Sequence, residues 1–184
     1  MKEENLNMSD DELVEYCLNK DVKAQKLLFN RFAPKMMGVC LRYASSSTEA
    51  EDMLQEGLIK VFEKLKMYSG KGSLEGWIRR IVVNNALDII RKNKKMKSNT
   101  SLDEVGFSLK KEQFIIEDLT ASELMKILQT IPLGYRTVFN MYAIEGYSHK
   151  EIADELGISV STSKSQLSRA RNVLKEIIEK NDLL

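Results

Sequence analysis

The stretch SHKEIADELGIS, residues 148–159, decides the fold of this chain. Its apolar residues recur at helical spacing, and among them the small Ala153 lets another helix approach closely. Gly157 can take the positive φ that ends a helix, and the polar residues after it can begin the next one. The pattern is typical of a helix-turn-helix, with one helix predicted over residues 148–156 and the next over 161–180.

The second of these helices carries an uneven charge. Between Ser159 and Lys175 the chain has four basic residues and no acidic one. A helix in the major groove of DNA needs short donors and long cations on its outer face, and phosphates would repel carboxylates there. The composition therefore favours DNA binding over the alternative, a small bundle whose last helix merely happens to be basic. We expect His149, beside the start of the first helix, to be a solvated surface residue or a phosphate contact.

The whole chain predicts an all-α fold. It has 184 residues, 43% of them apolar, with only nine glycines and two prolines, which is too few breakers for a many-turned β fold. The expected helix starts are capping boxes at 9–12 and 48–51, an Asp21 cap, Pro34 in a first turn, and Ser73. Further helices are expected over residues 121–130 and 133–145.

Two small helical domains joined by a flexible linker are the expected layout. Residues 92–118 have no sustained apolar period, so the last N-terminal helix is expected to end near Arg91 and to be followed by a tether. The predicted organisation is a first domain over residues 1–95, a linker over 96–118 and a helix-turn-helix domain over 119–184. At roughly 60 residues, the second domain is near the lower size limit for independent folding.

Cysteine and histidine usage argues against an enzyme. Cys17 and Cys40 are isolated, and with His149 they make no metal-binding or nucleophilic set. We therefore expect no catalytic activity, no metal and no cofactor. No apolar run approaches the ~20 residues that cross a bilayer, and the acidic N-terminus is unlike a signal peptide. The expected location is the cytoplasm, without membrane insertion.

Two helices of the N-terminal half carry informative polar faces. At about 100° per residue, one face of the helix after residue 48 gathers Asp52, Gln55, Glu56, Ile59 and Glu63. Acids, an amide and one exposed aliphatic residue suit docking to a basic protein groove, and an ordinary solvated face is the alternative.

The helix that begins at Ser73 carries the second face. Its polar strip consists of Arg80, Asn84, Asp88, Arg91 and Lys95. From Arg79 to Lys97 there are seven basic residues and one acidic residue, which indicates a polyanionic partner. Asn84 could read a base edge, and Asp88 could orient an arginine. The alternative is a network of surface pairs worth only ~0.3–0.5 kcal/mol each.

Read together, these strings resemble a known family. EAEDMLQE (49–56), YSGKGS (68–73) and WIRRIVVN (77–84) are similar to region 2 of bacterial sigma factors. The tail from Ile131-Pro132 to SQLSRAR (165–171) resembles region 4 of the same family. The length and two-domain layout are similar to those of the extracytoplasmic-function (ECF) group.

The resemblance implies a sigma factor that binds core RNA polymerase and directs promoter-specific initiation. The residues it assigns to the clamp helices of the polymerase's largest subunit are Asp52, Gln55, Glu56 and Ile59. Those it assigns to recognition and melting of the −10 element are Tyr68, Ser69, Lys71, Ser73, Arg79, Arg80, Asn84 and Arg91. Those it assigns to the −35 element are Lys150, Ser161, Thr162, Lys164, Ser165, Ser168, Arg169 and Arg171.

The resemblance also implies partners. These are core RNA polymerase, including its flap region, promoter DNA and an anti-sigma factor, with the free protein a monomer. Several residues depart from the family pattern, among them Ser163, which stands where Val is frequent and is expected to weaken local apolar packing, and Gln166, which stands where Arg is frequent. The competing reading is a stand-alone helix-turn-helix regulator, which would need a dimer interface that the sequence does not suggest.

Overall fold

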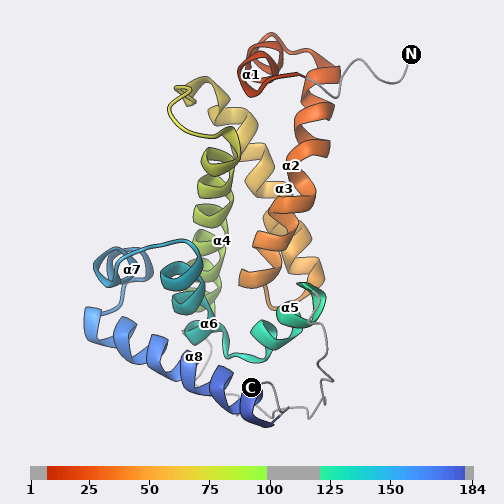
Figure 1. The fold of residues 1–184 in the computed structure, drawn as a ribbon. Coiled ribbons are helices and arrows are strands. Elements are labelled where there is room, and N and C mark those ends of the chain that lie inside the picture. Colours follow the sequence, from red (N-terminus) through yellow and green to blue (C-terminus); the bar gives the residue numbers. More distant parts are fainter. Residues whose placement is uncertain (1–7, 99–120, 181–184) are drawn as a thin grey trace. The chain divides into compact units, whose positions relative to one another are not determined.

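Helices account for all the regular structure that could be placed in this chain. The computed structural model describes residues 8–98 and 121–180, with side chains for residues 8–93 and 124–179. Every regular element in those ranges is helical, which confirms the predicted fold class (Figure 1). Within the same ranges, no helix has the length and hydropathy that crossing a membrane requires.

The chain forms two compact units, Met1–Ile89 and Ile90–Leu184, called unit 1 and unit 2 below. Helix α4 (Leu74–Ser98) runs across this boundary. The expected helix end near Arg91 is therefore wrong, because the lysines and other straight-chain residues that follow are good helix formers. The predicted domain limits stay a prediction, and residues 99–118 of the predicted linker lie outside the described residues.

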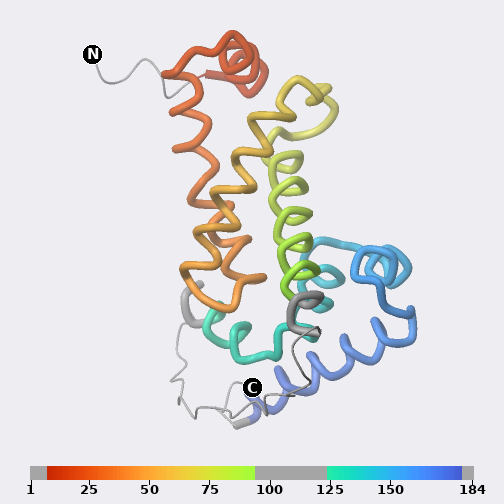
Figure 2. The backbone as a smooth tube through the Cα atoms, turned by 180° about the vertical axis from the view of Figure 1, so that it is seen from behind, coloured from red at the N-terminus to blue at the C-terminus, as the bar shows by residue number. Residues whose placement is uncertain are grey.

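Unit 1 is built on three long helices that run alongside one another, seen from behind in Figure 2. Its elements are α1 (Asp10–Leu18), α2 (Val22–Tyr43), α3 (Ser47–Lys64), a 3₁₀ turn (Leu65–Met67) and the first part of α4. Leu28, Met53 and Ile78, one from each long helix, are fully buried. Burial of these side chains supplies the main driving force for packing the three helices together.

Close approach of α3 and α4 depends on a glycine and an asparagine. A Cβ added to Gly57 would lie 3.2 Å from the Val82 side chain, so a larger residue there would require that side chain to shift by a few tenths of an ångström. One turn from this contact, buried Asn85 donates a hydrogen bond from Nδ2 to the Met53 carbonyl at 3.1 Å. These contacts fix the position of α4, which carries part of the candidate site.

The first expected capping box is confirmed and the second is wrong in register. The Ser9 hydroxyl accepts from the Glu12 N–H, and the Glu12 carboxylate accepts from the Ser9 N–H. Helix α3 is capped by Ser46, whose hydroxyl accepts from the Glu49 N–H at 3.1 Å, and not by Thr48. Ser46 and Glu49 have the same spacing as Thr48 and its partner, and the helix begins at the earlier pair.

Pro34 was expected in a first helical turn and lies instead in the interior of α2. An interior proline removes a hydrogen bond and costs ~3 kcal/mol. Buried side chains on both sides of it, including Phe32 before and Met36 and Tyr43 after, pack along one continuous helix and offset that cost.

Unit 2 contains α5 (Ala121–Thr130), α6 (Leu133–Phe139), a π-helical turn (Asn140–Ile144), α7 (His149–Leu156) and α8 (Val160–Lys180). The single helix expected over residues 133–145 is therefore interrupted. In the π turn the Glu145 N–H donates to the Asn140 carbonyl at 3.0 Å, which adds one residue to that turn. Helices α6 and α7 pack against α8 and bury Ile152, Leu167 and Ala170.

Both cysteines are free thiols in the interior of unit 1. Burial raises the pKa of the Cys17 thiol, and it raises the pKa of the Cys40 thiol to about 12. In the described part of the chain, no three His, Cys, Asp or Glu side chains gather in an arrangement that could hold a metal ion.

Alkylation should be slow in the folded protein. A raised pKa means that neither thiol is ionised at pH 8, and the thiolate is the reactive form. We expect both cysteines to react with iodoacetamide at pH 8 only after unfolding in guanidinium chloride, as followed by intact mass. Rapid labelling of the native chain would contradict the burial of these side chains.

Candidate interfaces for protein and nucleic acid

The predicted docking residues Asp52, Gln55, Glu56 and Ile59 lie together on the exposed side of α3. Ile59 is 52% exposed, which is unusual for a large aliphatic side chain. The face combines two carboxylates with an apolar residue, so it can attract a basic partner and bury apolar area against it.

An apolar groove of about 390 Å³ runs beside these residues and was not predicted from the sequence. Its walls come from α2 and α3 and are formed by Phe29, Met37, Glu51, Leu54, Gln55, Leu58, Ile59 and Phe62. Leu54 is half-buried and lines the groove. Phe29, which is 47% exposed, and Met37 come from α2, so only tertiary packing brings them beside the residues of α3.

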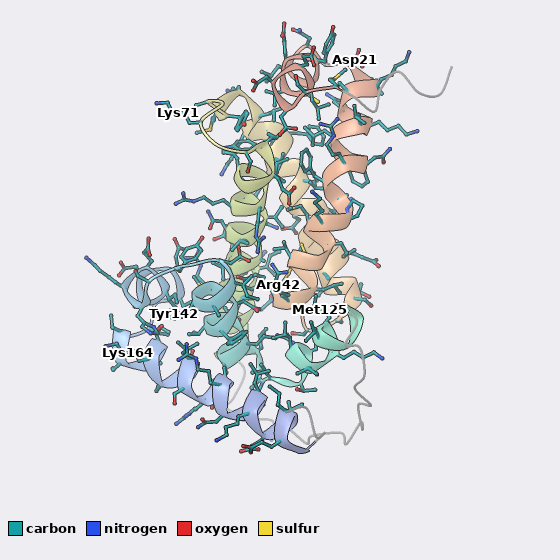
Figure 3. All side chains as sticks on the ribbon, viewed as in Figure 1. Asp21, Arg42, Lys71, Met125, Tyr142 and Lys164 are labelled. Atoms are coloured by element: carbon teal, nitrogen blue, oxygen red, sulfur yellow. The ribbon has the colours of Figure 1, made fainter. Side chains whose placement is uncertain are left out.

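The loop between the 3₁₀ turn and α4 holds the predicted residues Tyr68, Ser69, Lys71 and Ser73 (Figure 3 labels Lys71). The Tyr68 hydroxyl donates to the Gly72 carbonyl at 2.8 Å, and its ring meets the Trp77 ring at 5.5 Å between centroids. Partial burial and the nearby carboxylates Asp11 and Asp10 raise the pKa of Tyr68. These two contacts hold Tyr68 against the loop in the absence of a ligand.

Loop conformation also depends on glycine and on a cap. Gly70 and Gly72 both have positive φ, at 69° and 94°, which L side chains rarely adopt. The Ser73 hydroxyl accepts from the Gly76 N–H at 3.1 Å and so caps α4. Lys71, exposed between the two glycines, is the cation of this loop.

On α4, Arg80, Asn84 and Arg91 are exposed, while Arg79 is half-buried. The spacing of the exposed residues places them on one side of the helix. The Asp88 carboxylate lies 3.6 Å from the Lys60 ammonium of α3, a surface pair that the sequence did not predict. Asn84 is exposed, whereas the next residue, Asn85, is buried.

In unit 2 the helix-turn-helix has the predicted geometry. Ser148 caps α7 in a capping box with Glu151, and Gly157 ends α7 with φ 61° and ψ 42°. The predicted residues Lys150, Ser161, Lys164, Ser165, Ser168, Arg169 and Arg171 are all exposed, and Thr162 is half-buried. Figure 3 labels Lys164 near the start of α8.

Hydroxyl groups at the start of α8 are already hydrogen-bonded to one another. The Ser159 hydroxyl accepts from the Thr162 N–H at 3.0 Å and lies within 2.8 Å of the Ser161 and Thr162 hydroxyls. The Ser165 hydroxyl donates to the Thr162 carbonyl at 2.9 Å. These groups order the first turn of α8, and the long cations beyond it are exposed.

Two tyrosines support the arginines of α8, and sequence reasoning missed both. Arg169 Nη1 donates to the Tyr135 hydroxyl of α6 at 3.0 Å, and its guanidinium carbon lies 5.6 Å from that ring's centroid. The Arg171 guanidinium carbon lies 6.0 Å from the ring centroid of Tyr142, in the π turn. Tyrosines near basic residues are common, so spacing alone carried no signal for either pair.

His149 was expected to be a solvated residue or a phosphate contact; the structure contradicts the first alternative, and the second stays a prediction. It is half-buried, its Nδ1 lies 2.9 Å from the hydroxyl of Ser163, and its ring stacks on Tyr142 at 4.6 Å between centroids. Ser163 is fully buried, so its hydroxyl needs this partner. Ser163 was expected to weaken local apolar packing. The structure shows that its hydroxyl also makes a polar contact, which joins α7 to α8.

Breaking this pair should destabilise unit 2. We expect Ser163→Ala to lower its free energy of unfolding by ~1 kcal/mol, because the imidazole loses its partner in a part-buried site. A double-mutant cycle with His149→Ala, measured by urea unfolding, should return a coupling energy of ~0.5–1.5 kcal/mol. Additive effects of the two substitutions would contradict the hydrogen bond.

Two family models match this chain, one in its N-terminal half and one in its C-terminal half. The family model "Sigma-70 region 2" matches residues 28–96, and "Sigma-70, region 4" matches residues 121–174. The ECF RNA polymerase sigma-E factor of Haemophilus influenzae is 27% identical over 183 residues, which span 94% of this chain and 96% of the relative. The RNA polymerase sigma-H factor of Pseudomonas aeruginosa is 26% identical over 92% of this chain and 94% of its own length.

Solved structures agree with these relatives. The sigma factor RpoE of Bartonella quintana, crystallised with the anti-sigma factor NepR, has a TM-score of 0.51 and 25% identity, covering 86% of this chain and 98% of that one. CnrH, solved in complex with the cytosolic domain of CnrY, has the same fold, with a TM-score of 0.51 and 19% identity over 94% of this chain and 98% of its own. With regions 2 and 4 matched in the family's order and ECF sigma factors aligned along almost the whole length, this chain belongs to the ECF group of the sigma-70 family.

Proposed function

We propose that this chain is a promoter-specificity subunit of bacterial RNA polymerase, and that its two units have different binding partners. Unit 1 binds the core enzyme through α3 and holds the opened −10 element, while unit 2 binds the −35 element through α8. The observation that carries this proposal is the pairing, in one chain, of a helix-turn-helix with an exposed cationic recognition helix and a separate acidic, partly apolar face on α3.

On unit 2, the recognition helix combines two kinds of contact. Lys164, Ser165 and Arg169 project from α8 and are assigned to base edges, with Ser168 beside them. Ser161, Thr162 and Arg171, with Lys150 of α7, are assigned to phosphates, which fix the register of the helix in the groove. Base contacts supply the discrimination between promoters.

On unit 1, the loop around Tyr68 and the α4 strip form the proposed −10 surface. Extruding a base from the duplex costs a few kcal/mol, and a preformed polar pocket reduces that cost. The Tyr68–Gly72 hydrogen bond and the Tyr68–Trp77 contact keep the loop in place before DNA arrives. Lys71, Arg79, Arg80 and Arg91, with Lys92 beyond them, attract the backbone of the single strand.

Core polymerase is the proposed partner of the α3 face. Asp52 and Glu56 would meet basic side chains of the clamp helices, and Ile59 would be buried against them together with the apolar groove. We propose that unit 2 contacts the flap region and that an anti-sigma factor controls the free protein. The complexes of the Bartonella sigma factor with NepR and of CnrH with CnrY support this last proposal.

A stand-alone regulator is the less favoured function. It would leave the acidic α3 face and the matched region 2 without a role. Gel filtration of the pure chain, alone and with core polymerase, separates the two. Co-elution with the polymerase supports the sigma factor, and a dimer that ignores polymerase supports the regulator.

Transcription itself is the decisive test. Run-off reactions with core polymerase on fragmented genomic DNA, followed by sequencing of the RNA 5′ ends, should yield starts that share one upstream motif. Core polymerase alone is the control for background starts. If reconstituted holoenzyme produced no starts beyond that background, the proposed function would be wrong.

Asn84→Ala should impair promoter opening more than promoter binding. The exposed amide offers both a donor and an acceptor to a base edge, and its loss should cost ~1–3 kcal/mol, or about 5- to 150-fold, at the opening step. Permanganate footprints report opening and gel shifts report binding. Asn93→Ala, an exposed asparagine on the same helix outside the proposed surface, is the matched control. Equal losses in both assays would contradict the assignment of Asn84.

A further inference from the structure

We propose that Tyr135 is a positioning residue for promoter specificity: it orients the guanidinium of Arg169 so that Arg169 reads one base of the upstream element. This inference rests on the proposed function of α8. Tyr135 does not itself reach DNA in this proposal and acts only through Arg169.

Two contacts of different kind hold Arg169 on Tyr135. The Tyr135 hydroxyl accepts a hydrogen bond from Arg169 Nη1 at 3.0 Å, and the guanidinium carbon is 5.6 Å from the centroid of the ring. The second distance is within the range of cation–π attraction. Together they restrain both the position and the tilt of the guanidinium plane, although the arginine side chain is exposed.

Tyr135 is itself anchored. It is half-buried on α6, and α6 packs against α8 in unit 2. A tyrosine has only two rotatable side-chain angles, so its hydroxyl is a well-fixed acceptor compared with the end of a long side chain. The restraint on Arg169 therefore comes from the scaffold of unit 2, 34 positions earlier in the chain.

The restraint leaves Arg169 able to read a base. A guanidinium has five N–H donors, and the tyrosine uses one of them. Bidentate recognition of guanine O6 and N7 needs two more. A guanidinium held in place before binding loses less rotamer freedom when it meets the base, which strengthens the correct contact and sharpens discrimination against the wrong one.

A second pair in the same unit provides an internal comparison. Arg171 lies over Tyr142 at 6.0 Å, but Arg171 is two residues further along α8 and so points about 200° away from Arg169. The Tyr142 ring also stacks on His149, which ties it to the packing of α7. Arg171 is assigned to a phosphate, so loss of the Tyr142 hydroxyl should not change the preference for any base.

The test compares Tyr135→Phe, Arg169→Ala and the double variant with the natural chain. Each protein is assembled with core polymerase and used to transcribe a library of its own promoter, randomised one position at a time across the upstream element. Tyr135→Phe keeps the ring and its packing but removes the acceptor oxygen. We expect it to weaken preference three- to tenfold at a single position, the same one at which Arg169→Ala relaxes it, and the double variant to match Arg169→Ala.

Several outcomes would overturn the inference, and each has a distinct reading. If Arg169→Ala changes preference at one position while Tyr135→Phe changes nothing, the positioning role is wrong and the base-reading role stands. If Tyr135→Phe lowers or raises transcription uniformly across the library, its role is structural or inhibitory. If Arg169→Ala relaxes no position, the base-reading assignment fails together with the inference, while transcripts from the natural holoenzyme still establish the proposed function. Tyr142→Phe is the matched control, and thermal melts of all variants verify that unit 2 stays folded.

Discussion

A chain carrying both Asp52→Arg and Glu56→Arg is expected to lose affinity for core RNA polymerase by about 100-fold or more while remaining folded. The two side chains lie four residues apart on the exposed side of α3, so both changes act on the same patch. Replacing attraction by repulsion at an interface costs several kcal/mol. Substitutions at exposed positions away from packed contacts usually change stability by only ~0.5 kcal/mol.

The measurement is a titration of fluorescently labelled chain with core polymerase, accompanied by a thermal melt followed by circular dichroism. Asp52→Asn with Glu56→Gln should give a smaller loss, because it removes the attraction without adding repulsion. The single substitution Glu56→Arg is measured as well. Its matched control is Glu15→Arg, a charge reversal at an exposed residue of α1. If the doubly reversed chain bound core polymerase with unchanged affinity, α3 would not be the docking face.

Ile152→Ala is expected to unfold most of unit 2 and leave unit 1 intact. Ile152 is fully buried on α7, which packs against α8 and the π turn. Truncating a buried isoleucine costs ~2–5 kcal/mol, and a domain of this size rarely has more than ~3–5 kcal/mol of stability in total. Because unit 1 has its own core, polymerase binding should survive while binding to the upstream element is lost.

Hydrogen exchange on the full-length chain can resolve this selective loss. Peptides from α5–α8 should lose protection in the Ile152→Ala chain, and peptides from α1–α3 should exchange as in the natural protein. Ile152→Val, which removes one methyl group, should cost only ~0.5–1.5 kcal/mol and keep unit 2 folded. Unchanged protection in α7 and α8 would contradict the expected unfolding of unit 2, and equal loss in both units would show that the units do not have independent cores.

Prediction from the sequence worked best where a contact spans one helical turn. The Ser9 cap and the left-handed Gly157 both follow from residues within four positions of each other. The same rule failed at Thr48, because Ser46 satisfies the identical pattern two residues earlier. Here the local pattern located the start of α3 to within a turn, and competition between adjacent caps decided its first residue.

The candidate site divides in the same way. Exposure of the α3 face and of the α8 cations could be predicted, because helical periodicity alone decides which residues share a side. The apolar groove, which Phe29 and Ile59 both line, could not be predicted, because its walls come from two helices. Nor could the partners of His149 and Arg169, which are 14 and 34 positions away.

By itself, the sequence determined the all-α class, the Ser9 cap, the helix-turn-helix and the family, since each depends on short-range periodicity, hydrogen bonds within a turn or motif strings. Tertiary structure alone decided that α2 continues through Pro34, that Asn85 holds the Met53 carbonyl, and that Tyr135 supports Arg169. The physical reason is that burial and side-chain pairing depend on distance in space. Residues far apart in the chain meet only after the helices have packed.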